Sequence, residues 1–207
     1  MYTPKHFAET DTATMHDLMR EFPLATLVTQ SADGLEANHI PLHLEPNIGQ
    51  FGTLHGHIAR ANPLAKSATV HSDILVIFKG IDSYISPSNY ATKAEHGKVV
   101  PTWNYSAVHA NGELRLIDDP DWILRQISTL TAAHEAALPS PWAVSDAPAD
   151  YIEKMLGAIV GIEITITRLI GKWKLSQNQV DANKTSLIAA LDKTGHPMAE
   201  LIRAQQQ

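Results

Sequence analysis

The 207-residue chain contains no cysteine, which excludes disulfides, thiolate metal sites, iron–sulfur clusters and cysteine nucleophiles. It also lacks long hydrophobic runs. The apolar stretch at residues 74–78 is far too short to span a bilayer, and the first twelve residues have no apolar centre of the kind that a signal peptide needs. We therefore expect a cytoplasmic protein that has no membrane partner.

A basic excess is missing as well, because 16 Lys and Arg residues stand against 22 Asp and Glu residues, a net charge of −6. Proteins that grip DNA phosphates usually carry a basic face, so the charge does not support direct DNA binding. Histidine, by contrast, is abundant, with eleven residues. The length and the absence of repeats or linkers predict a single domain over residues 1–207 that ends in a short, polar, mobile tail.

The histidines gather in two predicted strands, Leu35–Glu45 and Phe51–Ala59. Side chains alternate between the two faces of a strand, so the apolar residues of each segment fall on one face and its polar rings on the other. A face that is rich in histidine but poor in charge is typical of a ligand surface or a subunit interface. The core face would carry Ile40, Leu42, Leu44, Leu54 and Ile58, and the opposite face His39, Pro41, His43, Thr53, His55 and His57.

The remaining pattern predicts a mainly β protein with peripheral helices, of the α+β class, built as a barrel. The clearest turn signal is Asn111-Gly112, which favours a tight hairpin between strands Val99–Ala110 and Glu113–Ile117. Further strands are expected at Leu24–Gln30, joined to the next strand by a turn at Ser31–Gly34, at Thr69–Lys79 and at Ile159–Ile170. Helices are expected at Thr10–Glu21, from Pro120 with an apolar stripe ending at Ala137, at Pro148–Leu156 and at Asp181–Leu191.

A candidate phosphate site lies where the Phe51–Ala59 strand ends and a short helix, near Asn62–Ser67, is expected to begin. His57, Arg60, Asn62 and Lys66 flank this junction. Free backbone N–H groups at a helix N-terminus beside a guanidinium fork suit a phosphate. The alternative is a helix that is merely capped by Asn62, with Arg60 on the surface. We expect no metal at the histidines, because no carboxylate lies between Glu45 and Asp73 and Arg60 would repel a cation.

Two further segments carry groups that could contact a planar cofactor. Trp103 and Tyr105 share one strand face, and Lys174, Gln177 and Asn178 follow a strand. Ordinary core packing and a solvated loop are the alternative interpretations. The sequence offers no nucleophile with a base and no paired carboxylates, so catalytic residues are unknown and any redox chemistry would belong to a cofactor.

Six segments, in order along nearly the whole chain, resemble the PaiB-like family of FMN-binding negative transcriptional regulators. They are Met1-Tyr2-x-Pro4-x-His6-Phe7, Asn38-His39-x-Pro41-x-x-Leu44, Gly56-His57-x-Ala59-Arg60-x-Asn62-Pro63, Tyr84-Ile85-Ser86-Pro87-Ser88-x-Tyr90, Val100-Pro101-Thr102-Trp103-Asn104-Tyr105 and Lys174-Leu175-Ser176-Gln177-Asn178. The resemblance implies an FMN-binding split β-barrel, related to the pyridoxamine-phosphate oxidase fold, and a homodimer with FMN at the subunit interface.

The resemblance also implies roles for particular residues. Asn38, His39, Ile40, Pro41 and Leu42 would border the flavin ring. His57, Arg60, Asn62 and Lys66 would lie at the phosphate, and Trp103, Lys174, Gln177 and Asn178 would close the pocket from either subunit. This assignment requires an Arg60 guanidinium that the chain's own acids do not neutralise.

Three functions follow from the resemblance. The first is a regulator that acts through its cofactor or a partner, with direct DNA binding implied by the family alone. The second is an FMN-dependent oxidoreductase, and the third is a haem-binding or haem-degrading split barrel, for which the histidines are suggestive.

Overall fold

The computed structural model describes residues 1–31, 34–66 and 70–206. The centre of the expected Ser31–Gly34 turn, Ser67 of the expected short helix and Thr69 of the next expected strand lie outside these residues. The chain packs as two compact units. The terminal unit comprises Met1–Leu18, Lys79–Val108 and Ile170–Gln207, and the central unit comprises Met19–Phe78 and His109–Leu169. That the chain is one domain stays a prediction.

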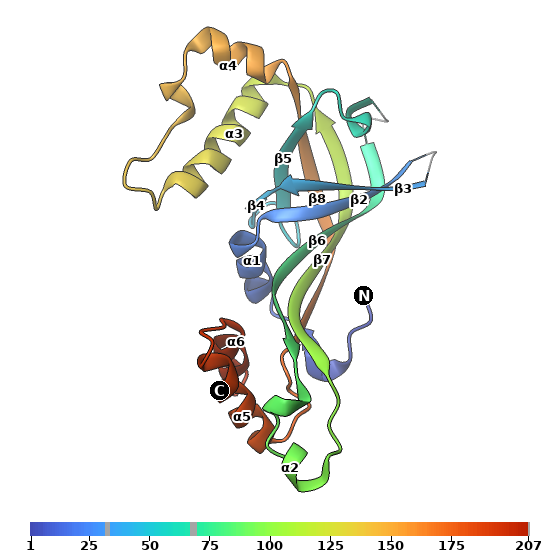
Figure 1. Cartoon of the computed structure of the whole chain (residues 1–207). Helices are drawn as coiled ribbons and strands as arrows, with labels where there is room; N and C mark the ends of the chain where they lie inside the picture. The colour runs from blue at the N-terminus through green and yellow to red at the C-terminus, as the bar shows by residue number, and fades with distance from the viewer. Residues whose placement is uncertain (32–33, 67–69, 207) are drawn as a thin grey trace. The chain divides into compact units, whose positions relative to one another are not determined.

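The central unit is built on a sheet with the strand order β3-β2-β6-β7-β8-β5-β4. The pairs β2–β3, β2–β6, β4–β5 and β5–β8 are antiparallel. Figure 1 shows the β2–β3 hairpin in blue at one end of this order. The strands are β2 (Leu24–Ser31), β3 (Gly34–Pro41), β4 (His43–Glu45), β5 (Thr53–Ala59), β6 (Val70–Ile85), β7 (Thr102–Ile117) and β8 (Ile159–Lys174), of which β6, β7 and β8 contribute residues to both units.

The alternation expected along Leu35–Glu45 and Phe51–Ala59 is largely confirmed. Ile40, Leu42 and Leu44 are buried, as are Leu54 and Ile58. The predicted strand Leu35–Glu45 is broken into β3 and β4 at Leu42, whose N–H donates to the Pro23 carbonyl at 2.9 Å. Thr53, expected on the outer face, is buried instead, and its hydroxyl donates to the Ile48 carbonyl.

Helix α3 (Pro120–Glu135) begins where its local signals predict. The Asp119 carboxylate accepts hydrogen bonds from the backbone N–H groups of Asp121 and Trp122, at 2.9 and 3.3 Å, and Pro120 takes the first helical position. Helix α3 lies against β5 and against α4 (Ala149–Leu156). Ala137, which the sequence places on the apolar stripe, lies beyond the helix end and is exposed.

The predicted hairpin at Asn111-Gly112 is wrong, because β7 runs without interruption from Thr102 to Ile117. A Cβ atom on Gly112 would lie 2.2 Å from the backbone oxygen of Thr165 on β8. Gly112 therefore serves the close approach of two paired strands rather than a turn. Pairing with β8 outweighs the local turn preference of the Asn-Gly step.

The terminal unit contains strand β1 (Ala8–Glu9), which pairs with the end of β8 at Lys172 and Gly171. Helix α1 (Thr12–Glu21) begins in this unit and is capped by Asp11, whose carboxylate accepts from the N–H and the hydroxyl of Thr14. The unit also contains the short helical segments η1 (Lys5–Phe7), η3 (Pro87–Asn89) and α2 (Lys93–His96).

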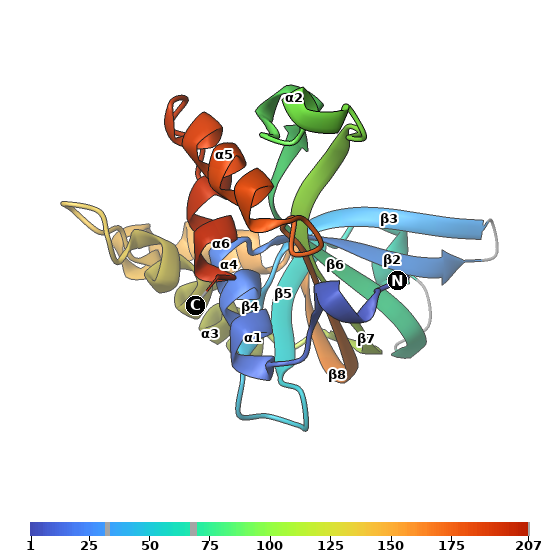
Figure 2. The same ribbon diagram turned by 90° about the horizontal axis from the view of Figure 1, so that it is seen from below.

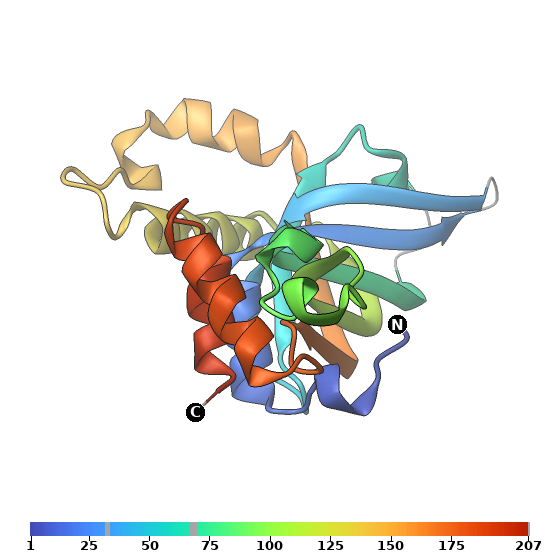
Figure 3. The same cartoon turned by 60° about the horizontal axis from the view of Figure 1, so that its bottom comes forward.

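The expected mobile tail is instead helical near its end. Helices α5 (Asp181–Asp192) and α6 (Met198–Ala204) lie side by side, as the red and orange-red helices of Figure 2 and Figure 3 show. Helix α5 also packs against η3. Met198, Ala199 and Ile202 are buried, so α6 has an apolar face despite its polar surroundings in the sequence. No helix in the described ranges is both long and apolar enough to cross a membrane.

Candidate functional site

Two of the predicted cofactor residues, Asn38 on β3 and Asn62 just before η2 (Pro63–Lys66), are joined by their amides. Asn62 Nδ2 donates to Asn38 Oδ1 at 2.8 Å, and Asn62 Oδ1 accepts from the Leu64 N–H at 2.9 Å. Asn38 Nδ2 is buried and has no hydrogen-bond partner among the described residues. A buried amide donor without a partner is costly, so this atom suits an acceptor oxygen from a bound molecule.

Arg60, at the end of β5, is held by groups of the central unit itself. Its two terminal nitrogens donate to the two carboxylate oxygens of Asp118, at 2.7 and 2.8 Å. Its Nε donates to the Gly157 carbonyl at 2.8 Å, and Nη2 also donates to the Ile159 carbonyl at 3.0 Å. These bonds use four of the five N–H groups of the guanidinium. The phosphate assignment required an Arg60 guanidinium that no acid of the chain neutralises, and in the structure Asp118 neutralises it.

The Arg60 hydrogen bonds lower the pKa of the Asp118 carboxyl below its usual range. A carboxyl with a depressed pKa contributes its stabilisation above the unfolded pKa and loses it only as the pH falls through the folded value. The ion pair is thus fully formed at neutral pH. Both side chains are well exposed, however, at 42% for Arg60 and 65% for Asp118, so solvent screens their attraction.

The short helix expected after Asn62 is a single four-residue 3₁₀ segment, η2. Such a short segment has little of the dipole that a longer helix would offer to a phosphate. Lys66, its last residue, is exposed. Any phosphate at this corner would depend on side chains rather than on a helix N-terminus.

The residues expected to border the flavin ring divide into two groups. His39 and Pro41 are exposed on β3, with His39 Nδ1 lying 3.1 Å from the Thr26 hydroxyl of β2. The Ile40 and Leu42 side chains are in the core. A molecule bound on the outer face would meet the backbone of Ile40 and Leu42 rather than their side chains.

Helix α3 covers the outer face of β5, which carries His55 and His57. His57 Nδ1 lies 2.9 Å from Gln126 Oε1, and the His55 ring meets the Trp122 ring edge to face at 5.1 Å. Gly161 on β8 allows this packing, since a Cβ atom there would lie 2.5 Å from the Trp122 ring. His57 is therefore occupied by a helix of its own unit.

The other four predicted site residues belong to the terminal unit. Trp103 is 54% exposed and meets Tyr84 edge to face at 5.8 Å, and the Lys174 ammonium donates to the Thr102 hydroxyl. Gln177 uses both ends of its amide on its own loop, donating to the Trp173 carbonyl at 2.6 Å and accepting from the Leu175 N–H at 2.7 Å. Asn178 is exposed and helps to line a cavity of about 270 Å³. Trp103 and Asn178 are thus more accessible to a ligand than Gln177.

The sheet and its helices define the class: a split β-barrel of the kind found in flavin-binding proteins. The fold is similar to that of an FAD- and haem-binding protein from Mycobacterium smegmatis (TM-score 0.60, 17% identity, 81% of this chain and 73% of that one). It is also similar to a flavocytochrome from Azotobacter vinelandii (TM-score 0.58, 17% identity, 83% and 72%).

The chain belongs to the family described as "Putative FMN-binding domain", whose model matches residues 1–168. Two relatives align over nearly their whole length. The Bacillus subtilis protein named protease synthase and sporulation protein PAI 2 is 29% identical, over 98% of this chain and 96% of the relative. An uncharacterised protein of Emericella nidulans is 35% identical, over 94% and 92%. FMN is the cofactor that this family membership assigns, and the assignment rests on the family rather than on Arg60.

Sequence reasoning missed two sets of residues around these sites. Asp118, the partner of Arg60, is 58 positions away, and nothing local announces the pair. The second set is a polar stripe on α3, formed by Trp122, Arg125, Gln126 and Thr129, which line a cavity against β4 and β5. Arg125, Gln126 and Thr129 follow Trp122 by three, four and seven positions. This spacing places the four side chains on one face of a helix and can be recognised in the sequence.

Proposed function

We propose that this protein is an FMN-binding regulator that acts through its cofactor state or a protein partner. The observation that carries the proposal is the end-to-end similarity to the Bacillus subtilis relative, whose name links it to protease synthesis and sporulation. The net charge of −6 favours a protein or metabolite partner over direct contact with DNA phosphates.

The corner formed by β3, the end of β5 and η2 is the proposed location of the FMN phosphate and ribityl chain. The buried Asn38 Nδ2 offers a donor and Asn62 fixes its orientation. Arg60 would bind the phosphate in exchange for the Asp118 carboxylate that it holds in the structure. When bound, FMN would supply redox chemistry, while these residues bind and orient it. Lys66 contributes a further positive charge.

The direct test is to identify what copurifies with the protein. We expect a yellow preparation with flavin absorption and the mass of FMN in the released ligand. A Soret band without flavin would favour the haem-binding alternative, which the haem-containing structural neighbours keep as the second candidate. Reduction of bound FMN by a nicotinamide cofactor, with turnover, would favour an oxidoreductase. DNA binding that weakens steeply with salt would revive direct repression.

We also propose a homodimer with FMN at the interface, which the outer face of the β2–β3 hairpin supports. Leu24 and Leu35 are 66% and 78% exposed there, and Ala37, His39 and Pro41 are exposed beside them. β3 ends the strand order, so in the described part of the sheet it pairs on one side only. Exposed apolar side chains on an edge strand are typical of an interface that a second copy covers.

The variant Leu35→Glu is expected to shift the protein from dimer to monomer, because it places a charge in the proposed apolar interface. Analytical ultracentrifugation measures the change, and FMN content should fall with it. Leu138→Glu is the matched control, since Leu138 is 50% exposed and belongs to the loop after helix α3 rather than to the hairpin. A Leu35→Glu variant that stays dimeric would show that the subunits meet elsewhere.

A further inference from the structure

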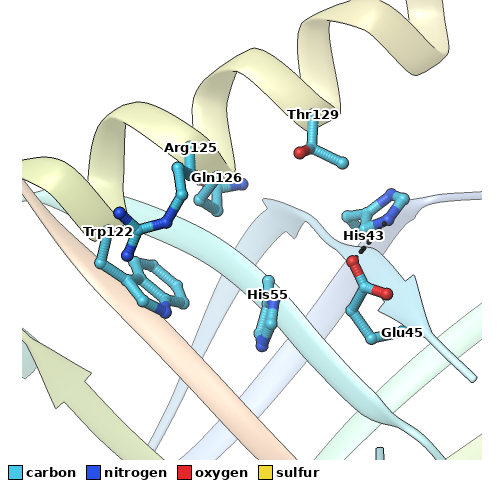
Figure 4. Close-up of a pocket in the computed structure, with 7 residues that line it drawn as sticks. All are labelled: His43, Glu45, His55, Trp122, Arg125, Gln126 and Thr129. Carbon is cyan, nitrogen blue, oxygen red and sulfur yellow. Dashed lines mark ion pairs between the residues drawn. The ribbon is translucent and has the colours of Figure 1, made fainter. Parts of the chain in front are cut away.

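A cavity of about 240 Å³ lies between helix α3 and strands β4 and β5. Figure 4 shows Trp122 and Arg125 at one end, His43 with Glu45 at the other, and His55 between them. Thr129 comes from α3 above His43. None of the residues that the family resemblance assigns to FMN lines this cavity. Only His57 among them is hydrogen-bonded to a lining residue, Gln126, within the described ranges, so the cavity is a distinct candidate site.

The α3 side of the cavity contains a side-chain amide, that of Gln126, with a hydrogen-bond partner in the described part of the chain for only one of its two polar atoms. Gln126 is only 5% exposed, and its Oε1 is bonded to His57 Nδ1 at 2.9 Å. Its Nε2 is buried without a partner among the described residues. If the amide is turned over, Oε1 becomes the atom without a partner, so either orientation leaves one polar atom available to a ligand. A cavity with such an atom is built for a polar molecule rather than for an apolar one.

The charges around the cavity leave one cation uncompensated. Glu45 lies 3.3 Å from His43 Nε2. Glu163 accepts from Arg115 at 2.7 Å and also lies 3.2 Å from His55 Nε2, close enough for an ion pair but without hydrogen-bond geometry. Arg125, in contrast, has no ion pair within the described ranges of the chain. A guanidinium without a carboxylate partner suits a carboxylate ligand, which it can bind through two parallel hydrogen bonds.

Glu45 limits the charge that the ligand can carry. Its carboxylate lines the same cavity, so a dianion such as a phosphate monoester would meet stronger repulsion than a monoanion does. Trp122 supplies a flat apolar wall beside Arg125 (Figure 4). We propose that this cavity binds a small planar monocarboxylate, with Arg125 on the carboxylate, Gln126 and Thr129 as further polar partners, and Trp122 against the ring.

Benzoate is the probe for this site, and isothermal titration calorimetry on the purified full chain is the measurement. We expect saturable binding of one benzoate per chain, with a dissociation constant below about 10 mM. Benzamide, the neutral analogue, and phenyl phosphate, the dianion, should bind at least several-fold more weakly. Arg125→Gln should weaken benzoate binding about tenfold, and Thr129→Val by a smaller factor, since a charged hydrogen bond contributes more than a neutral one.

Arg168→Gln is the matched control, because Arg168 is an exposed arginine of the same unit that bonds Asn111 and lies outside the cavity. It should leave benzoate binding unchanged. Equal binding of benzamide, unchanged affinity in Arg125→Gln, or no saturable benzoate binding would overturn the proposal. The titration is repeated with saturating FMN. If FMN binds, unchanged benzoate affinity supports a separate site, whereas competition would overturn it; if FMN does not bind, the benzoate and Arg125→Gln titrations decide the proposal by themselves.

Discussion

Replacing Gly112 with valine is expected to lower the free energy of unfolding by about 3 kcal/mol. The valine Cβ would lie 2.2 Å from the Thr165 carbonyl oxygen, and that oxygen belongs to the backbone of a paired strand. It cannot move aside without disturbing the pairing of β7 with β8. Strand propensity alone predicts the opposite sign, because valine favours strands and glycine does not. Urea unfolding of the two proteins measures the difference as a shift in midpoint.

Gly157→Ala provides the comparison for a tolerated glycine substitution. Gly157 has a φ of −63°, and its added Cβ would be at ordinary contact distance, 3.5 Å, from the Lys154 carbonyl oxygen. We expect a change of less than about 0.5 kcal/mol there. A Gly112→Val protein as stable as the wild type would mean that β7 does not approach β8 closely at this residue and would restore the turn interpretation of Asn111-Gly112.

The parts of the fold that depend on neighbouring residues could be predicted from the sequence. Helix α3 begins at Pro120 because Asp119 caps it, and these two signals are adjacent in the sequence. The burial of Ile40, Leu42 and Leu44 follows from the period of a strand, which the apolar residues already show. The flavin-binding fold is implied by the resemblance of six short motifs, in order, to a known family.

The parts that failed depend on residues far apart in the chain. The Asn111-Gly112 step has the strongest turn preference in the sequence, yet the backbone of Thr165 decides its structure. Helix α6 forms in a predicted tail because α5 covers its apolar face. In the candidate site, the motifs named Arg60 and His57 but could not reveal that Asp118 and Gln126 occupy them. Local sequence patterns identify candidate site residues, whereas contacts with residues distant in the sequence decide whether their polar groups can still bind a ligand.

Arg60→Ala is expected to weaken FMN binding by roughly 10- to 100-fold, the effect of losing a charged hydrogen-bond donor to the phosphate. In the structure Asp118 fills the guanidinium fork with two parallel bonds. A phosphate presents oxygens in a similar geometry and can take the place of the carboxylate. The exchange is inexpensive because the pair is exposed and solvent screens it. Fluorescence quenching of FMN on titration with apoprotein gives the dissociation constant.

Asp118→Asn separates this exchange from a purely structural role of Arg60. If the carboxylate competes with the phosphate for the fork, its neutralisation should tighten FMN binding while Arg60→Ala weakens it. Arg203→Ala, which removes an arginine paired with Asp192 and Glu200, should leave the affinity for FMN unchanged. Should both site variants bind FMN like the wild type, Arg60 is a clamp that ties the end of β5 to Asp118, Gly157 and Ile159, and the phosphate binds elsewhere.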